Sequence, residues 1–124
     1  MVMERHLSLA TIAILLTYSV ALAGGQVLFK LAALRFAPAA RWTDNVVSLA
    51  LNPYLVVAVL LYALLSAVWV WVLTFVPLST AYPFVALTFV LTVASGALFF
   101  GEPVSVRLVL GGLMIIAGLI VITR

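Results

Sequence analysis

The feature that most constrains this chain is the stretch from Asn45 to Gly101, which contains no Asp, Glu, Lys, Arg or His. As a single α-helix, at 1.5 Å per residue, it would be roughly 85 Å long, whereas the hydrocarbon core of a bilayer is about 30 Å thick. The stretch must therefore fold back on itself. Because 68% of the residues are hydrophobic and 7% are charged, the chain also lacks the polar surface of a water-soluble fold. We therefore expect an integral membrane protein.

Turn and capping residues divide the chain into four predicted spans. Pro38 stops the first helix, and Asn52-Pro53 matches an N-cap followed by proline at the first helical position. Residues 76–79 and 101–103 contain Pro77, Gly101 and Pro103 and are predicted turns. The predicted spans are residues 7–34, 53–75, 80–100 and 104–122. The expected fold is all-α: one polytopic four-helix bundle over residues 1–124, with both termini on one side.

The connections carry further predictions. Trp42 is the amphipathic residue expected at a membrane interface, and residues 46–51 are expected to lie flat on the surface. Thr80 is expected to cap the third helix, which leaves Pro83 in its first turn. Pro103 is expected to start the fourth helix.

The N-terminus allows a second interpretation. Charged residues 4–6, an apolar run and Ala-Leu-Ala at 21–23 together look like a secretory signal with its cleavage site. The apolar run resumes, however, and continues through residues 27–34. An uncleaved first helix is therefore the favoured prediction.

Charge and cysteine content argue against several classes of protein. The net charge is +3, but the six basic residues are scattered and form no nucleic-acid patch; at helix ends they suit anionic lipid headgroups better. Cysteine is absent, which excludes disulfides and thiolate sites. The single histidine, His6, is interpreted as a solvated terminal residue, and the three acidic residues lie at chain ends or turns. We expect no metal, no cofactor and no enzymatic activity.

The distribution of basic residues leaves the membrane orientation open. Arg5 and Arg124 are predicted on one side of the membrane, and the other side receives Arg35, Arg41 and Arg107, with Lys30 nearby. This bias is small, so insertion in both orientations remains possible. Two oppositely oriented copies would have the inverted symmetry that transporters use for alternating access.

Polar residues inside the first helix are candidates for a site, because an ionisable residue in lipid is expensive. Gln26 and Lys30 are four residues apart and share one helix face. Gln26 offers an amide and Lys30 a charge for an anionic headgroup, while Gly24 and Gly25 allow close approach of a helix or ligand. The alternative is helix packing, with Lys30 snorkelling to the interface.

The last two helices contain weaker candidates. Tyr82 lies on a polar stripe of the third helix, whose threonines favour packing. Gly111 and Gly118 share a face of the fourth helix and suit a dimer interface. Glu102 and Arg107 flank that helix's start, where capping or a local ion pair is favoured, although Arg107 could hold a phosphate.

Several of these motifs, in this order, resemble the drug/metabolite transporter superfamily (EamA-like). They are residues 25–30, 76–83 and 101–105 and the spaced glycines of the fourth helix. The closest likeness is to the small subunits of the aminoarabinose-phosphoundecaprenol flippase, which show Ala-Gly-Gln with a downstream Lys, Ala-Tyr-Pro and Glu-Pro-Val-Ser in the same order. The small multidrug resistance exporters are also similar, in chain length, in the number of helices and in the glycines of the fourth helix, so the resemblance implies a four-helix bundle like theirs. Aligning the two on Lys30, however, places Leu22 where those exporters carry a glutamate embedded in the membrane.

The resemblance implies a homodimer, or a heterodimer with a sister subunit, that moves a polyprenyl-phosphate-linked sugar across the bacterial inner membrane. The substrate-binding candidates are Gln26, Lys30, Tyr82, Arg35, Arg41 and Arg107, and the dimer-interface candidates are Gly111 and Gly118. An exporter of small cations or metabolites, and a non-transporting partner of a membrane enzyme, remain as alternatives.

Overall fold

The computed structural model describes residues 7–124. Its elements, in chain order, are α1 (Leu9–Leu34), α2 (Trp42–Ala50), α3 (Pro53–Leu73), α4 (Leu78–Phe100) and α5 (Val106–Thr123). Within this described part, α1, α3, α4 and α5 are long and apolar enough to cross a membrane. The prediction of an all-α fold with four candidate membrane spans is therefore confirmed. The predictions made for residues 4–6, including His6, lie outside the described residues.

Helix starts follow local capping chemistry. The Asn52 side chain accepts hydrogen bonds from the N–H groups of Tyr54 and Leu55, with Pro53 at the first helical position, as predicted. At α5, however, the Ser105 hydroxyl accepts a hydrogen bond from the N–H of Leu108. The helix therefore begins at Val106, and the prediction that Pro103 starts it was wrong.

The start of α4 also differs from the prediction. The Pro77 carbonyl accepts hydrogen bonds from the N–H groups of Thr80 and Ala81, so the helix begins at Leu78 and Thr80 is not its cap. This earlier start places Pro83 inside the helix rather than in its first turn. Because proline has no N–H, the carbonyl four residues earlier, that of Ser79, lacks its usual helical partner.

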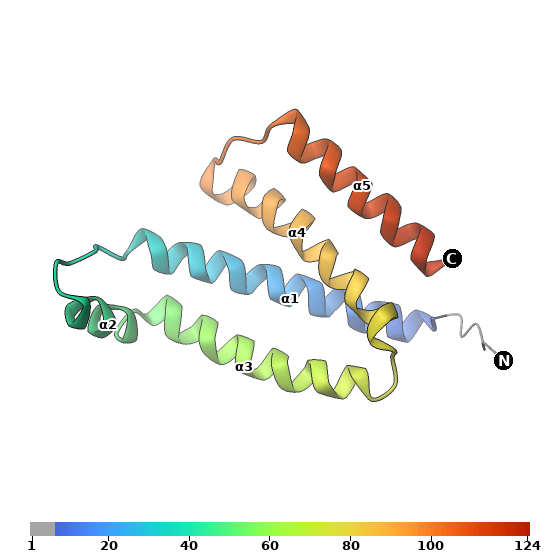
Figure 1. Ribbon diagram of the computed structural model, residues 1–124, viewed down its shortest axis with the longest axis horizontal. Coiled ribbons are helices and arrows are strands. Elements are labelled where there is room, and N and C mark those ends of the chain that lie inside the picture. Colours follow the sequence, from blue (N-terminus) through green and yellow to red (C-terminus); the bar gives the residue numbers. More distant parts are fainter. Residues whose placement is uncertain (1–6) are drawn as a thin grey trace.

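The helices form an open bundle in which α1 is central (Figure 1). α3 runs antiparallel beside α1, α4 crosses α1 on another side, and α5 packs on α4 alone among the described helices. The beginning of α1 and the end of α5 lie at the same end of the bundle. The C-terminal ends of α1 and α4 therefore lie together at the opposite end.

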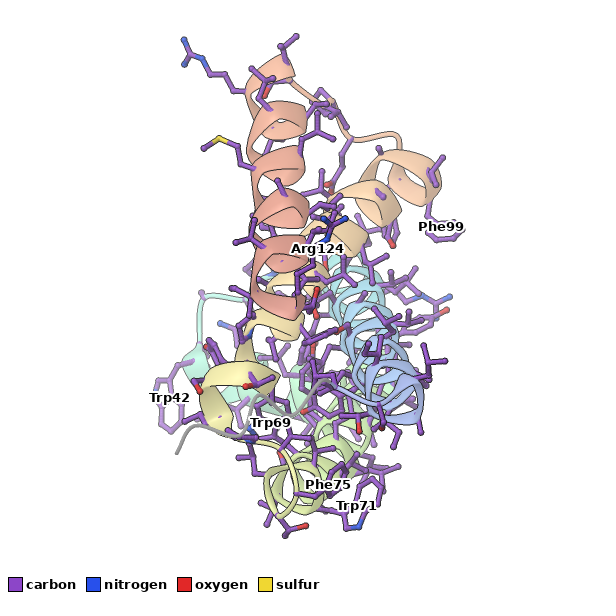
Figure 2. The ribbon with its side chains drawn as sticks, turned by 90° about the vertical axis from the view of Figure 1, so that its right-hand side faces the viewer. Trp42, Trp69, Trp71, Phe75, Phe99 and Arg124 are labelled. Atoms are coloured by element: carbon purple, nitrogen blue, oxygen red, sulfur yellow. The ribbon has the colours of Figure 1, made fainter. Side chains whose placement is uncertain are left out.

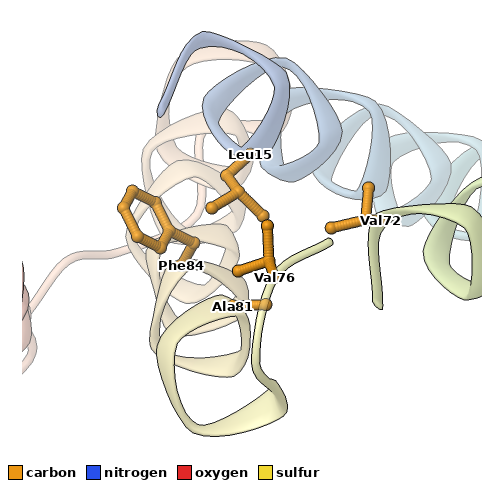
Figure 3. Packing of buried hydrophobic residues seen from close by; sticks show 5 residues of the cluster. All are labelled: Leu15, Val72, Val76, Ala81 and Phe84. Carbon is orange, nitrogen blue, oxygen red and sulfur yellow. The ribbon is translucent and has the colours of Figure 1, made fainter. Parts of the chain in front are cut away.

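The buried core lies near the turn between α3 and α4. Leu15, Val72, Val76, Ala81 and Phe84 come together there, where α1, α3 and α4 converge (Figure 3). At this end the three helices pack closely, because the short turn holds the end of α3 against the start of α4.

Polar groups reinforce the crossing of α1 and α4. The Ser19 hydroxyl is fully buried, 2.7 Å from the Phe84 carbonyl of α4 and 2.9 Å from the Leu15 carbonyl of its own helix. Thr88 of α4 donates to the Ser19 carbonyl at 3.4 Å. A buried hydroxyl that bridges two helices fixes their relative position, because lipid offers no alternative hydrogen-bond partner.

Large apolar side chains cover the outside of the bundle. Trp42, Trp71, Phe75 and Phe99 point away from neighbouring helices (Figure 2) and are 41–75% exposed. In water such a surface would be unstable, whereas in a bilayer it meets acyl chains, and tryptophan favours the headgroup level. No residue of α2 is buried, and this helix includes most of the segment that we expected on the membrane surface.

Candidate functional site

A cleft of about 350 Å³ lies between α1 and α4. Its lining residues are Gln26, Val27, Phe29, Lys30, Thr92, Ser95, Gly96, Phe100 and Glu102. Two charges, an amide and two hydroxyls thus meet in a chain with few polar side chains. A cleft of this size is within the usual range for small-molecule sites, about 300–1,000 Å³.

An ion pair crosses this cleft. The Lys30 ammonium is 2.8 Å from Oε1 of Glu102, and the two side chains are 43% and 47% exposed. The predicted cap or local ion pair with Arg107 for Glu102 is wrong, because the carboxylate faces α1 rather than the start of α5. Lys30 lies four residues, roughly 6 Å of helix, before the end of α1. The pair is therefore near one membrane surface and open to a ligand.

A glycine-dependent turn positions Glu102. Gly101 ends α4 with φ of 63°, a conformation that glycine adopts without steric strain. The Glu102 N–H then donates to the Gly96 carbonyl at 3.1 Å. A methyl group added at Gly96 would lie 2.6 Å from Oε2 of Glu102. Both glycines thus allow the carboxylate to fold back over α4 toward Lys30.

Tyr62 of α3 holds Gln26 in place. Nε2 of Gln26 donates to the Tyr62 hydroxyl at 2.8 Å, and that hydroxyl donates to the Leu22 carbonyl at 3.0 Å. The Tyr62 ring stacks on Phe29, with centroids 5.2 Å apart, and lies directly against Gly25. Sequence reasoning missed Tyr62; the available signal was a tyrosine in the middle of an apolar helix.

Hydroxyl groups of α4 line the opposite side of the cleft. Ser95 donates to the Leu91 carbonyl of its own helix at 2.8 Å, as hydroxyl side chains in apolar helices commonly do. The Thr92 hydroxyl is buried and has no hydrogen-bond partner among residues 7–124. It therefore retains its hydrogen-bonding capacity next to the cleft.

The other predicted site residues lie outside this cleft. Tyr82 is 63% exposed and lies ten residues before Thr92, roughly 15 Å along α4. Arg35 stacks over the Tyr54 ring at 4.7 Å, and Arg41 is the N-cap residue of α2. Arg107 is exposed in the first turn of α5. The structure thus brings together Gln26 and Lys30 but not the other four candidates.

The glycines of α5 differ in their surroundings. Gly111 and Gly118 have no neighbour within 4 Å of an added methyl group, whereas Gly112 is buried near Val90 of α4. Gly112 therefore supports packing within the chain, and residues 7–124 leave the face with Gly111 and Gly118 uncovered. Over residues 7–124, no group of three His, Asp or Glu side chains could hold a metal ion.

Three curated proteins are similar in sequence to this chain, and each is named "Probable 4-amino-4-deoxy-L-arabinose-phosphoundecaprenol flippase subunit ArnE". The identity is 42% over 65 residues for the protein of Sodalis glossinidius (strain morsitans), 40% over 70 for that of Serratia proteamaculans (strain 568), and 32% over 69 for that of Enterobacter sp. (strain 638). The matched segments cover 52–56% of this chain, which spans about three fifths of the relatives' length, 59–64%. The resemblance to these flippase subunits is thereby confirmed.

No protein-family model matches the chain, and no solved structure matches it. The relatives are named as flippase subunits rather than as enzymes. Together with the four apolar helices, this similarity supports a multi-pass membrane protein related to flippase subunits.

Proposed function

We propose, from the similarity to these flippase subunits, that the chain is one subunit of a flippase in the bacterial inner membrane. Its cargo would be a sugar of the aminoarabinose type linked to a polyprenyl phosphate. The observation that carries the proposal is the cleft between α1 and α4, where Lys30, Gln26 and Glu102 meet in a chain with few polar side chains. Such groups are expensive to place in lipid, and a polar cargo explains their presence.

In the proposed mechanism, the headgroup crosses through this cleft while the polyprenyl tail remains among the acyl chains. Lys30 would bind the phosphate through charge-assisted hydrogen bonds. The side-chain amide of Gln26 donates one N–H to the Tyr62 hydroxyl, so its carbonyl oxygen is available to accept hydrogen bonds from sugar hydroxyls. An isolated charge costs about 3 kcal/mol or more at the bilayer centre, and binding to Lys30 and Gln26 would offset part of the cost of bringing the charged headgroup into the membrane.

The arginines would act at the membrane surface. Arg35 and Arg41 flank the connection after α1, and Arg107 lies in the first turn of α5, so all three belong to the end of the bundle that contains Lys30. Basic side chains at this level attract phosphate groups. Tyr82 faces outward and would contact cargo only in a cavity completed by a second subunit.

A dimer is part of the proposal. Among the described helices α5 packs only on α4, and its small residues Gly111 and Gly118 face no other part of the described chain. Small residues at this spacing permit close helix contact in lipid, where packing rather than hydrophobicity drives association. We propose that a second copy or a sister subunit packs on this face.

The rival function, export of small cations, is less well supported by the geometry. Such an exporter needs an uncompensated acid in its cavity, but Glu102 is paired with Lys30. A site with balanced charge attracts a monovalent cation only weakly.

Proteoliposomes containing the chain, alone and with any subunit that co-purifies, test the proposal. The cargo would be a short-chain polyprenyl phosphate sugar whose exposure is measured with a membrane-impermeant reagent. Lys30→Ala should slow flipping about ten- to hundredfold, the loss expected for hydrogen bonds to a charged group, while the purified protein keeps its elution volume. Arg124→Ala, at the opposite end of the bundle, should flip normally.

Other outcomes would contradict this function. Proton movement that depends on an added cation, with no lipid flipping, would identify an exporter. Inactivity in every combination, together with stable co-purification with a membrane enzyme, would identify an assembly partner. Flipping at an unchanged rate by Lys30→Ala would remove Lys30 from the site.

A further inference from the structure

The cleft contains an acid as well as a base, and the proposed function has so far used only the base. Lys30 and Glu102 are in direct contact, at 2.8 Å, yet each side chain is nearly half exposed. The two residues come from different elements, Lys30 from α1 and Glu102 from the turn after α4. They can therefore separate without either helix unfolding.

A cargo that carries only negative charge would fit this arrangement poorly. When its phosphate binds Lys30, Glu102 loses its partner and remains close to the phosphate. Two like charges at short distance repel each other, and the carboxylate has lost the ion pair that balanced its charge. The carboxylate would thus oppose the binding that Lys30 favours.

A cargo that carries both charges removes this conflict. Its phosphate can take Lys30 while an ammonium group takes Glu102, so one ion pair is exchanged for two. The long, flexible stem of lysine lets its ammonium move away as the cargo enters. The turn fixed by Gly96 and Gly101 keeps the carboxylate at the cleft.

We propose that Glu102 binds a cationic amine of the headgroup while Lys30 binds its phosphate, so that the cleft selects a zwitterionic headgroup. The Lys30–Glu102 ion pair is then the resting state of the site, which the cargo opens. This inference rests on the proposed flippase function and deepens it, because it assigns a cargo charge to each of the two residues.

Two matched lipids test the inference. Both are short-chain polyprenyl phosphate sugars; one has a free amine on the sugar, and in the other the same amine is acetylated and neutral. The wild-type protein should flip the amine-bearing lipid about tenfold faster or more, as expected when one hydrogen bond to a charged group is lost. Equal rates for the two lipids would overturn the inference.

Variants separate binding from a purely structural role of the ion pair. Glu102→Gln should slow the amine-bearing lipid about tenfold and leave the acetylated lipid unchanged or faster. Asp44→Asn makes the same chemical change on α2, which contributes no residue to the lining of the cleft, and should alter neither rate. Equal slowing of both lipids by Glu102→Gln would show a structural role and overturn the inference.

The exchange of the two charges is a further control. Lys30→Glu combined with Glu102→Lys restores an ion pair, so the protein should remain folded. Because the lipid tail stays in the bilayer, the headgroup should enter the cleft in one orientation, and its phosphate would then meet Glu at position 30 instead of Lys. Flipping of the amine-bearing lipid should therefore not return. Its full recovery would show that only the presence of the pair matters and would overturn the inference.

A binding measurement distinguishes failure of this inference from failure of the proposed function. The purified protein would be mixed with equal amounts of the two lipids and analysed by native mass spectrometry. Preferential retention of the amine-bearing lipid supports the inference even if neither lipid is flipped, an outcome that would contradict the flippase function alone. Equal retention contradicts the inference, whatever the transport rates.

Discussion

Tyr62 of α3 accepts a hydrogen bond from Gln26 of α1 at 2.8 Å and donates one to the Leu22 carbonyl at 3.0 Å. One hydroxyl therefore joins two helices and orients the amide that lines the cleft. Its ring adds a stacking contact with Phe29. A residue that does not line the cleft thus orients one that does.

Tyr62→Phe removes both hydrogen bonds and keeps the stacking ring. The variant should be less stable by about 1–2 kcal/mol, the net value of two such bonds, as measured by chemical unfolding in detergent micelles. Flipping should also slow, because Gln26 is no longer held. Tyr54→Phe is the matched control, since its ring still supports Arg35; equal loss in both variants would contradict the role of Tyr62.

Gly24 and Gly25 are adjacent, but substitution by alanine should have opposite effects on stability at the two positions. A methyl group at Gly25 would collide with the Tyr62 ring, whereas at Gly24 it meets no atom within 4 Å. Gly25→Ala should destabilise the protein by about 1–3 kcal/mol through overpacking. Gly24→Ala should stabilise it by about 0.5–1 kcal/mol, because alanine is the better helix former. Thermal unfolding of both variants measures the difference, and equal shifts would contradict the α1–α3 packing described above.

Asn52 performs two tasks at the start of α3. Its Oδ1 caps the helix, and its Nδ2 donates to the Ala32 carbonyl near the end of α1 at 2.9 Å. Asn52→Ala should cost about 1–3 kcal/mol, since a cap and a buried hydrogen bond are lost together. Ser105→Ala, which removes only a cap from α5, should cost about 1 kcal/mol. The same unfolding assay compares them, and a larger loss at Ser105 would contradict this assignment.

The uncovered glycines of α5 predict an effect on assembly rather than on folding. Gly118→Leu or Gly111→Leu should weaken dimer formation about tenfold, or 1.4 kcal/mol, because a bulky side chain keeps the second helix at a distance. Cross-linking yield and native mass spectrometry would measure this effect. Met114→Leu, at a 74% exposed position of α5, is a size-conserving control. An unchanged dimer in both glycine variants would place the interface elsewhere.

Local rules determined much of the fold from the sequence alone. The charge-free stretch is too long for one crossing, and proline, asparagine and glycine mark where the chain turns. These effects act within a few residues, which is why the start at Pro53 and the existence of four spans could be predicted. The two wrong helix starts, at Thr80 and at Pro103, have the same cause. In each case another residue, Pro77 or Ser105, accepts the hydrogen bonds of the first helical turn.

The partners across helices could be found only in the tertiary structure. In lipid, apolar residues surround each helix, so no hydrophobic face indicates which side meets a neighbour. The sequence thus identified Gln26 and Lys30 as unusual but did not predict Tyr62 or Glu102 as their partners. Nor did it predict that Gly112, rather than Gly111 or Gly118, packs within the chain. The free energy of transferring residues into lipid determines which segments span the membrane, and it can be read from the sequence. The way in which the helices cross determines which side chains meet in the cleft, and only the tertiary structure shows it.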